Sequence, residues 1–231
     1  MRTLGLIGGM SWESTAEYYR LINRGVAERR GGLHSAPLLL HSVDFAAVAE
    51  LQRREDWAAA GALLAAAARG LERAGAAALV LCTNTMHHVA PAIEGAAGVP
   101  LLHIVDATGD ALRAAGVRRV GLLGTRYTME LPFWRERLRS RHGVEVLVPG
   151  AEDRALVHRV IYDELCRGVV SDASRAAYAG VIARLGDAGA EGVVLGCTEI
   201  TLLVGPADSA LPVFDTTALH ARASVDFLTA D

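Results

Sequence analysis

A repeated pattern constrains the fold of this chain more than any other feature of its sequence. Residues 4–9 read Leu-Gly-Leu-Ile-Gly-Gly, and residues 120–125 repeat the plan as Val-Gly-Leu-Leu-Gly-Thr, at an offset of 116. Each copy has the form of a buried strand that runs into a glycine turn. An internal duplication is the economical explanation, so the sequence predicts two halves of similar plan.

Each half also contains an apolar run that stops abruptly in small polar side chains. The first, residues 79–85, reads Leu-Val-Leu-Cys-Thr-Asn-Thr, and the second, residues 193–199, reads Val-Val-Leu-Gly-Cys-Thr-Glu. An Ala-Gly-Ala tripeptide precedes each run, and aligning the tripeptides gives an offset of 114. That offset carries Thr83 onto Cys197. We therefore expect these two strand ends to face each other across a substrate.

The order of the elements predicts the fold class. Strand-like runs alternate with helix-like segments, which indicates an α/β protein with parallel sheets covered by helices on both faces. We expect two pseudo-symmetric α/β domains, the first formed by residues 1–115 plus 212–231 and the second by residues 116–211. Ligands of such sheets bind at the carboxyl ends of the strands. The sequence therefore predicts one site in a cleft between the domains.

Composition excludes several classes of protein. All 23 cationic residues are arginine, so a pyridoxal-phosphate Schiff base and a P-loop both lack their lysine. The net charge of −3 and the scattered basic residues give no footprint for nucleic acid. No uninterrupted run of apolar residues is long enough to cross a membrane. Three cysteines are too few for a disulfide framework, which favours a cytoplasmic setting.

Cys82 and Thr83 compete for the same role, because successive strand residues point to opposite faces of a sheet. A cysteine is the better acid or base, and this favours Cys82. The internal offset instead places Cys82 opposite Gly196 and Thr83 opposite Cys197. We therefore predict that Thr83 faces the site, with Cys82 as the alternative.

The residues around the two strand ends have both structural and functional interpretations. Cys197 lies where a strand becomes a helix, and the following N–H groups should favour its thiolate. Asn84, Thr85 and Thr198 fit helix caps, and they also suit the binding of a carboxylate. His87 and His88 are adjacent and have no spaced partners, so we expect no metal site.

The sequence resembles the aspartate/glutamate racemase superfamily, whose members racemise amino acids without pyridoxal phosphate. The likeness runs along nearly the whole chain and is closest to the branch of broad-specificity amino-acid racemases and L-aspartate/glutamate-specific racemases. Four segments carry it: Gly8-Gly9-Met10-Ser11, Asn84-Thr85-Met86-His87, Gly124-Thr125 with Thr128-Met129, and Gly196-Cys197-Thr198-Glu199.

The resemblance implies a site and an assembly. It assigns Thr83 and Cys197 as the opposed catalytic groups, although the usual family pattern has a cysteine in place of Thr83. It further implies a homodimer that acts on a small amino acid and needs no cofactor. By resemblance the pocket is lined by Met10, Gln52, Asn84, Thr85, Thr125 and Thr198, with Glu199 as an orienting group.

One departure from the family concerns the recognition of a side-chain carboxylate. Typical aspartate racemases have a lysine where this chain has Cys166, and Arg53 or Arg167 is the available substitute. The expected function is α-proton exchange on an amino acid between Cys197 and Thr83. Two alternatives remain: another reaction of the superfamily (hydantoin racemisation, maleate isomerisation or malonate decarboxylation), or a non-catalytic protein that binds a small ligand.

Overall fold

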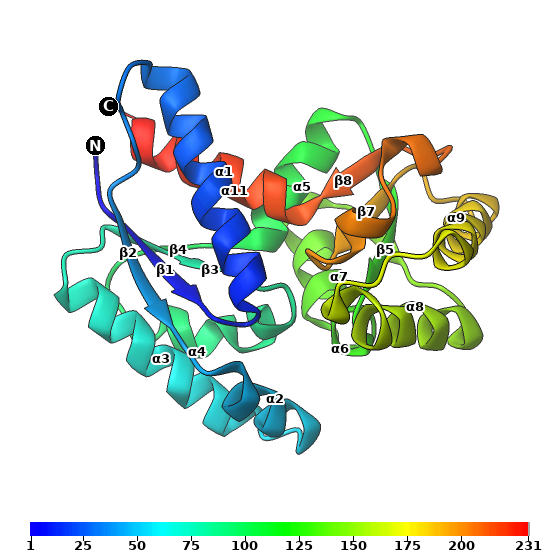
Figure 1. Cartoon of the computed structure of the whole chain (residues 1–231), viewed down its shortest axis with the longest axis horizontal. Helices are drawn as coiled ribbons and strands as arrows, with labels where there is room; N and C mark the ends of the chain where they lie inside the picture. Colours follow the sequence, from blue (N-terminus) through cyan, green and yellow to red (C-terminus); the bar gives the residue numbers. More distant parts are fainter. Residues whose placement is uncertain (231) are drawn as a thin grey trace. The chain divides into compact units, whose positions relative to one another are not determined.

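The computed structural model describes residues 1–230, which form two compact units (Figure 1). The first unit contains Met1–Ile104 and the segment that begins at His220, and the second contains Val105–Leu219. The chain passes from the first unit to the second at the start of the helix at 104–114, and it returns to the first unit within the last helix. The sequence analysis instead expected the first boundary after residue 115, at the end of the helix at 104–114, and the second after residue 211, before the final strand.

The sheet of the first unit has four parallel strands in the order β2-β1-β3-β4. Its centre is apolar, and every residue of β1 and β3 is buried. The prediction of a parallel α/β sheet is therefore confirmed for this unit. The strands are β1 (Leu4–Gly8), β2 (Leu38–Ser42), β3 (Ala78–Leu81) and β4 (Leu101–Leu102).

Helices cover both faces of this sheet (Figure 1). On one face Leu6 of β1 and Val80 of β3 pack against the first and last helices. On the other face Leu81 packs against the alanine-rich side of the third helix. The helices of this unit are α1 (Trp12–Arg30), α2 (Phe45–Arg53), α3 (Trp57–Arg73), η1 (Thr85–Val89), α4 (Ala90–Glu94) and α11 (Thr216–Thr229), which starts in the second unit.

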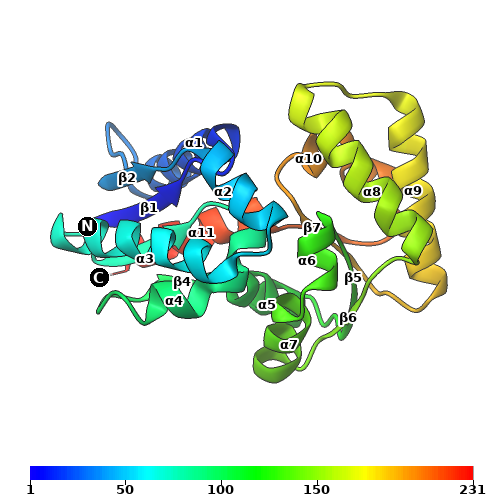
Figure 2. The ribbon, with the colours of Figure 1, turned by 90° about the horizontal axis from the view of Figure 1, so that it is seen from below.

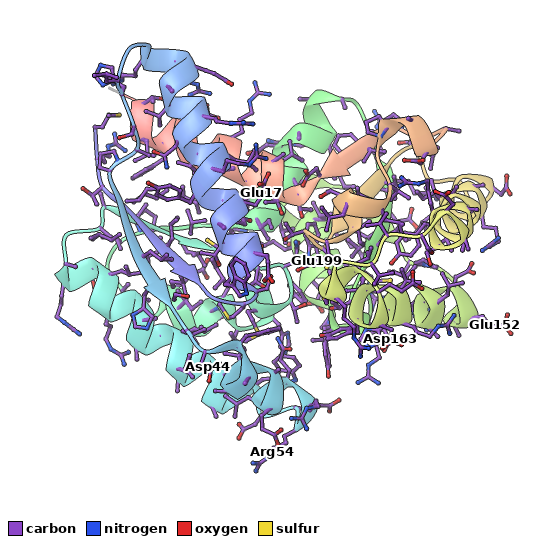
Figure 3. The ribbon with its side chains drawn as sticks, viewed as in Figure 1. Glu17, Asp44, Arg54, Glu152, Asp163 and Glu199 are labelled. Atoms are coloured by element: carbon purple, nitrogen blue, oxygen red, sulfur yellow. The ribbon has the colours of Figure 1, made fainter. Side chains whose placement is uncertain are left out.

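Side-chain caps explain where several of these helices begin. Ser11 Oγ accepts a hydrogen bond from the Ser14 N–H at 3.3 Å at the start of α1. Asp44 caps the start of α2, and Arg54 follows its last residue; both are labelled in Figure 3. Asp56 caps the start of α3. Each such cap is worth about 1 kcal/mol.

The second unit repeats the plan with a parallel sheet in the order β6-β5-β7-β8. Helices α8 and α9 lie side by side (Figure 2), and the Tyr178 hydroxyl joins them by donating to the Val157 carbonyl at 2.8 Å. The strands are β5 (Arg119–Gly124), β6 (Glu145–Leu147), β7 (Val193–Gly196) and β8 (Val213–Asp215). The helices are α5 (Ile104–Ala114), α6 (Arg126–Glu130), α7 (Phe133–Arg137), η2 (Leu138–His142), α8 (Ala151–Asp163), η3 (Leu165–Arg167), α9 (Asp172–Asp187), α10 (Ile200–Leu203) and η4 (Pro206–Asp208).

The strand registers reproduce the internal repeat. In the first sheet Ile7 pairs with Leu81, and the Cys82 N–H donates to the Ile7 carbonyl at 2.9 Å, so Cys82 stands beside Gly8. In the second sheet Gly124 pairs with Gly196. Because Gly124 is the counterpart of Gly8, Gly196 is the counterpart of Cys82. The residues that follow, Thr83 and Cys197, therefore occupy the same place in the two sheets.

No helix within residues 1–230 is both long and apolar enough to cross a membrane. Within the same range, no group of three or more His, Cys, Asp or Glu side chains is placed to hold a metal ion.

Candidate functional site

Cys82 lies inside the core of the first unit. Its side chain is fully buried in the cluster that β1 and β3 form with α1 and α11. Burial also raises the pKa of its thiol far above the usual range. The neutral, enclosed thiol fits a packing role in the core.

Backbone hydrogen bonds hold Thr83 on both sides of its Cα. Its N–H donates to the Leu81 carbonyl at 2.9 Å, and the preceding carbonyl, of Cys82, accepts from Ser14 Oγ at 3.3 Å. Its own carbonyl accepts from His87 Nδ1 at 2.7 Å. Thr83 is half-buried, so the residue at this strand end is both firmly held and accessible.

The other predicted residues of the first unit gather around Met86. Gln52 is buried on α2, and its amide Nε2 donates to the Met86 sulfur at 3.0 Å. Met10 packs into the same hydrophobic cluster as Met86. Asn84 and Thr85 lie next to Met86 in the chain and are also buried. Asn84 stands at the start of η1 without a side-chain cap bond, so the expected capping role is wrong for this residue.

Local packing requires glycine at positions 8 and 9. A Cβ on Gly8 would lie 2.4 Å from the Thr15 side chain, and a Cβ on Gly9 would lie 2.2 Å from the Val43 carbonyl. Gly9 also has a positive φ of 93°. Its N–H donates to Thr15 Oγ1 at 2.8 Å, which ties the turn to α1.

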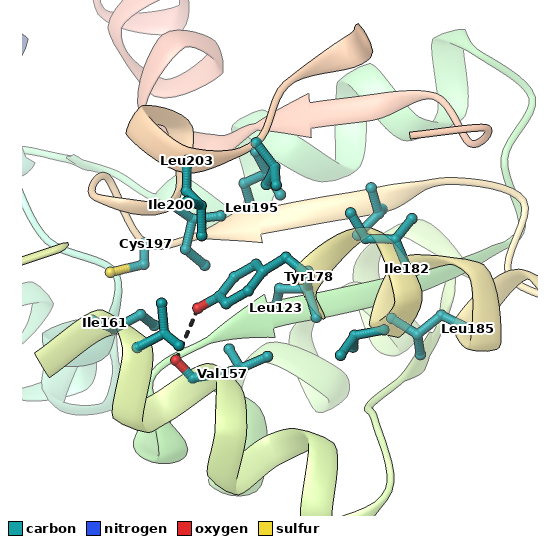
Figure 4. Packing of buried hydrophobic residues seen from close by; sticks show 14 of the residues in the cluster. Leu123, Val157, Ile161, Tyr178, Ile182, Leu185, Leu195, Cys197, Ile200 and Leu203 are labelled. Atoms are coloured by element: carbon teal, nitrogen blue, oxygen red, sulfur yellow. Dashed lines mark hydrogen bonds between the residues drawn. The ribbon is translucent and has the colours of Figure 1, made fainter. Parts of the chain in front are cut away.

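Cys197 lies at the end of β7 in the second unit. Its side chain is 9% exposed and closes one edge of the hydrophobic cluster formed with α8 and α9. Figure 4 shows its sulfur pointing away from the clustered side chains. A thiol at the rim of a core is shielded from bulk water and yet able to reach a ligand.

The sequence analysis expected Cys197 to favour its thiolate, whereas the structure favours the protonated thiol. Burial raises the pKa of the Cys197 thiol well above its usual range, and the Glu199 carboxylate raises it further. The Glu199 backbone N–H lowers this pKa, as expected from a helix start, but it is outweighed. The helix that follows, α10, has only four residues. The thiol is therefore protonated at neutral pH, and the expectation of a favoured thiolate is wrong.

Glu199 is the hydrogen-bond partner of this thiol. Cys197 Sγ donates to Glu199 Oε2 at 2.9 Å (Glu199 is labelled in Figure 3). Thr198 lies between them in the chain, and its carbonyl accepts from Thr201 Oγ1 at 2.7 Å. Thr125 caps α6 by accepting from the Thr128 N–H at 3.3 Å, as Ser11 caps α1 in the first unit. Thr125, Thr198 and Glu199 thus all stand at the strand ends of the second sheet.

Sequence reasoning missed Tyr162. Burial raises the pKa of this phenol, and the charges of Cys197, Cys166, Tyr127 and Glu199 raise it further, which places the phenol near these groups. Tyr162 is 37% exposed, so the phenol is accessible. No local sequence signal pointed to it, because α8 ends at Asp163 and Cys166 lies in the separate turn η3.

Arg53 and Arg167, the substitutes considered for the family lysine, each lie beside an acidic side chain at the surface. Arg53 pairs with Glu50, and Arg167 lies 3.9 Å from Asp163. Both arginine side chains are 70% exposed. Cys166 itself is exposed and has no disulfide partner.

Two four-stranded parallel sheets flanked by helices, with Thr83 and Cys197 at matching strand ends, match the two-domain fold of racemases. The chain belongs to the Asp/Glu/Hydantoin racemase family, because the model of that family matches residues 7–224. Membership of this family and the likeness to solved racemases support a racemase-type, isomerase function.

Several solved structures of racemases or racemase homologues are similar to this chain. A candidate Asp/Glu racemase from Yersinia pestis is 54% identical, with both chains covered to 100% and a TM-score of 0.95. An aspartate racemase homologue from Pyrococcus horikoshii OT3 is 31% identical over 100% of both chains, with a TM-score of 0.85. Glutamate racemase from Francisella tularensis, solved with D-glutamate, shares the fold at 13% identity and a TM-score of 0.67, over 98% of this chain and 81% of its own.

Proposed function

We propose that this protein is a cofactor-independent amino-acid racemase, specific for aspartate and glutamate or of broad specificity. The two sides of the reaction are assigned to Cys197 and to a group at Thr83, which would act on the same substrate Cα. One observation carries the proposal: Thr83 and Cys197 follow the strand ends at the same register position of the two sheets.

Glu199 supplies the route by which the thiol becomes a base. In the free protein the thiol is protonated, since burial and Glu199 raise its pKa. The S–H bond breaks as its proton moves to Glu199 Oε2, and this leaves a thiolate. The thiolate then takes the α-proton, so that a new S–H bond forms as the Cα–H bond breaks. Thiolates are the reactive form of cysteine in such steps.

The Thr83 side returns a proton to the opposite face of Cα: an O–H bond breaks as the new Cα–H bond forms, the oxyanion left behind takes a proton from solvent, and Glu199 gives up its proton to solvent. A threonine hydroxyl is a much poorer acid and base than a thiol, so Thr83 or a water held beside it would perform this step slowly. The site is therefore lopsided: removal of the α-proton by Cys197 is fast and removal from the Thr83 side is slow. The chain has no lysine for a Schiff base, so these side chains carry the chemistry of the proposal without pyridoxal phosphate.

Exchange of the α-hydrogen in D₂O tests the proposal. We expect deuterium to enter one enantiomer of the preferred amino acid faster than the other, as followed by NMR. Cys197→Ala should reduce exchange by about 10²–10⁴-fold, the usual contribution of a general acid or base. Ser140→Ala, at an exposed position of η2, is the control and should leave the exchange rates of both enantiomers unchanged. The panel should include aspartate, glutamate, neutral amino acids and hydantoins.

Two results would contradict the proposal. Equal exchange rates for both enantiomers would contradict the lopsided site. Full activity in Cys197→Ala would remove Cys197 from the reaction and would favour a non-catalytic role in binding.

A further inference from the structure

The His87 ring links the turn after β3 to the start of α5. It is 1% exposed, and both of its nitrogens make hydrogen bonds to the backbone. Nδ1 lies 2.7 Å from the Thr83 carbonyl oxygen, and Nε2 accepts from the Ile104 N–H at 3.3 Å. The ring therefore bridges the residues that follow β3 and β4.

These two contacts define the protonation state of His87. A carbonyl oxygen can only accept, so Nδ1 must carry the hydrogen. A backbone N–H can only donate, so Nε2 must offer its lone pair. His87 is thus the neutral tautomer with hydrogen on Nδ1, the one form that satisfies both neighbours.

The rings packed around His87 hold it in place. The His103 ring centroid lies 4.5 Å away and that of His220 lies 5.8 Å away, both at steep angles. His220 Nε2 donates to the Leu102 carbonyl at 2.7 Å, and its Nδ1 accepts from the Tyr18 hydroxyl at 2.8 Å. His87 therefore belongs to a cluster of buried rings whose hydrogen bonds lead to the backbone.

His87 completes the restraint of Thr83. The peptide plane before Thr83 is held by Ser14 and Leu81, and the plane after it is held by His87 alone among the hydrogen bonds described above. Fixing both planes determines the direction of the Cα–Cβ bond. Only χ1 then remains, and it is stiff in a β-branched residue.

The second half repeats the turn but not this contact. The His87 N–H donates to the Asn84 carbonyl, and the Thr201 N–H donates to the Thr198 carbonyl, at the same offset of 114. At the matching position, however, the Thr201 side chain bonds to the Thr198 carbonyl and not to that of Cys197. The Cys197 carbonyl instead accepts from the Ile200 backbone N–H at 3.2 Å, so an anchor from a side chain is particular to the first half among the hydrogen bonds described here.

We propose that His87, as the neutral tautomer with hydrogen on Nδ1, is a positioning residue that aims the Thr83 side chain. The inference rests on the proposed racemase function and extends it. Loss of this anchor slows the step on the Thr83 side by roughly 10- to 100-fold, the range expected when a reacting group is displaced by up to about 1 Å. The step at Cys197 and the KM change little.

Two substitutions separate the roles of the two ring nitrogens. His87→Asn keeps an amide N–H in the place of Nδ1, and His87→Gln keeps an oxygen acceptor in the place of Nε2. We expect α-hydrogen exchange from the Thr83 side to persist in His87→Asn and to fall in His87→Gln, with exchange from the Cys197 side retained in both. Thermal unfolding of each variant reports the separate effect on stability. His88→Gln is the control, since it changes the neighbouring histidine, whose ring packs on Trp57.

Faster exchange from the Thr83 side in His87→Gln than in His87→Asn would overturn the positioning role. So would an equal loss of exchange from the Thr83 side and from the Cys197 side in both variants. The tautomer is read independently of turnover from ¹⁵N shifts of the histidine side chains in the wild-type protein, and the His87 signal is assigned by its loss in His87→Asn. A protonated Nε2 at neutral pH would also overturn the inference. If the wild-type protein exchanges no α-hydrogen while the tautomer is as stated, the proposed function fails, and the aiming role fails with it.

Discussion

At the scale of single residues, the pairing of Cys197 with Glu199 sets the chemistry of the second unit. The carboxylate lies 2.9 Å from the thiol and has two opposite effects on it. Its charge raises the pKa of Cys197 and keeps the thiol protonated, whereas in the proposed mechanism its oxygen accepts the proton when a thiolate is required. In that mechanism one side chain lowers the resting reactivity of the thiol and also enables turnover.

Glu199→Gln separates these two effects. Removing the negative charge lowers the pKa of Cys197, so alkylation of Cys197 by iodoacetamide at pH 8 should become faster. Turnover should fall by about 10²-fold or more, because the proton acceptor is lost. Mass spectrometry of peptides gives the alkylation rate of Cys197 apart from that of exposed Cys166. An unchanged alkylation rate would show that Glu199 does not control the thiol.

The residues also show how far sequence reasoning reaches. The offset of 114 predicted that Thr83 and Cys197 are counterparts, and the strand registers agree, because a repeat carries its register along the backbone. The pKa of Cys197 was predicted in the wrong direction, since it depends on burial and on the orientation of Glu199. Tyr162 was missed for the same reason: its nearness to Cys197 depends on packing between α8 and the end of β7.

At the scale of elements, α11 is held on the first unit by His220 as well as by apolar packing. A Cβ on Gly25 would lie 2.7 Å from Val225, so α1 and α11 approach closely at a glycine. His220 is fully buried, and burial lowers its pKa to about 4. The alternation of strand-like and helix-like segments predicted helices, but the hydrogen bond between Tyr18 and His220 spans 202 residues and no local pattern contains it.

The low pKa of His220 predicts a loss of stability in acid. The unfolded chain binds a proton at His220 near pH 6.5, whereas the folded protein does so near pH 4. Stability should therefore be unaffected by His220 above pH 6.5 and should fall by roughly 3 kcal/mol as the pH drops to 4. Urea unfolding at pH 7.5, 5.5 and 4.5 would measure this. His220→Gln should be less stable at pH 7.5 and should show a flatter dependence, and an equally steep one would assign the effect to other groups.

At the scale of the whole molecule, the chain passes twice between two units that have separate hydrophobic cores. The second unit is continuous and its cluster contains α8 and α9, whereas the first unit needs the segment after Leu219 to cover one face of its sheet. The stability of the first unit therefore depends on the end of the chain.

Truncation after Leu219 tests this dependence. It leaves the Leu102 carbonyl and the Tyr18 hydroxyl without their partner His220 and exposes the apolar face of α1. Unsatisfied buried groups cost about 1–3 kcal/mol each. Hydrogen–deuterium exchange with mass spectrometry should become faster in α1 and β4 and stay unchanged in α8 and α9.

A milder pair of substitutions provides the control for the truncation. Val225→Ala should speed exchange in α1 and α11, and Val181→Ala, in the core of the second unit, should speed it in α8 and α9, each without effect on the other unit. Faster exchange throughout the chain in either variant would show that the two cores unfold as one.

The hydrogen bonds described for Thr83 all involve the backbone N–H or carbonyl groups of residues 82 and 83, and this has a consequence for evolvability. Ser14, Leu81 and His87 hold the peptide planes around position 83 and make no demand on its side chain. The scaffold can therefore accept a different side chain there without a new fold. Natural variation at this one position could convert a lopsided site into a two-thiol site, or the reverse, so that the balance between the two directions of the reaction is open to selection.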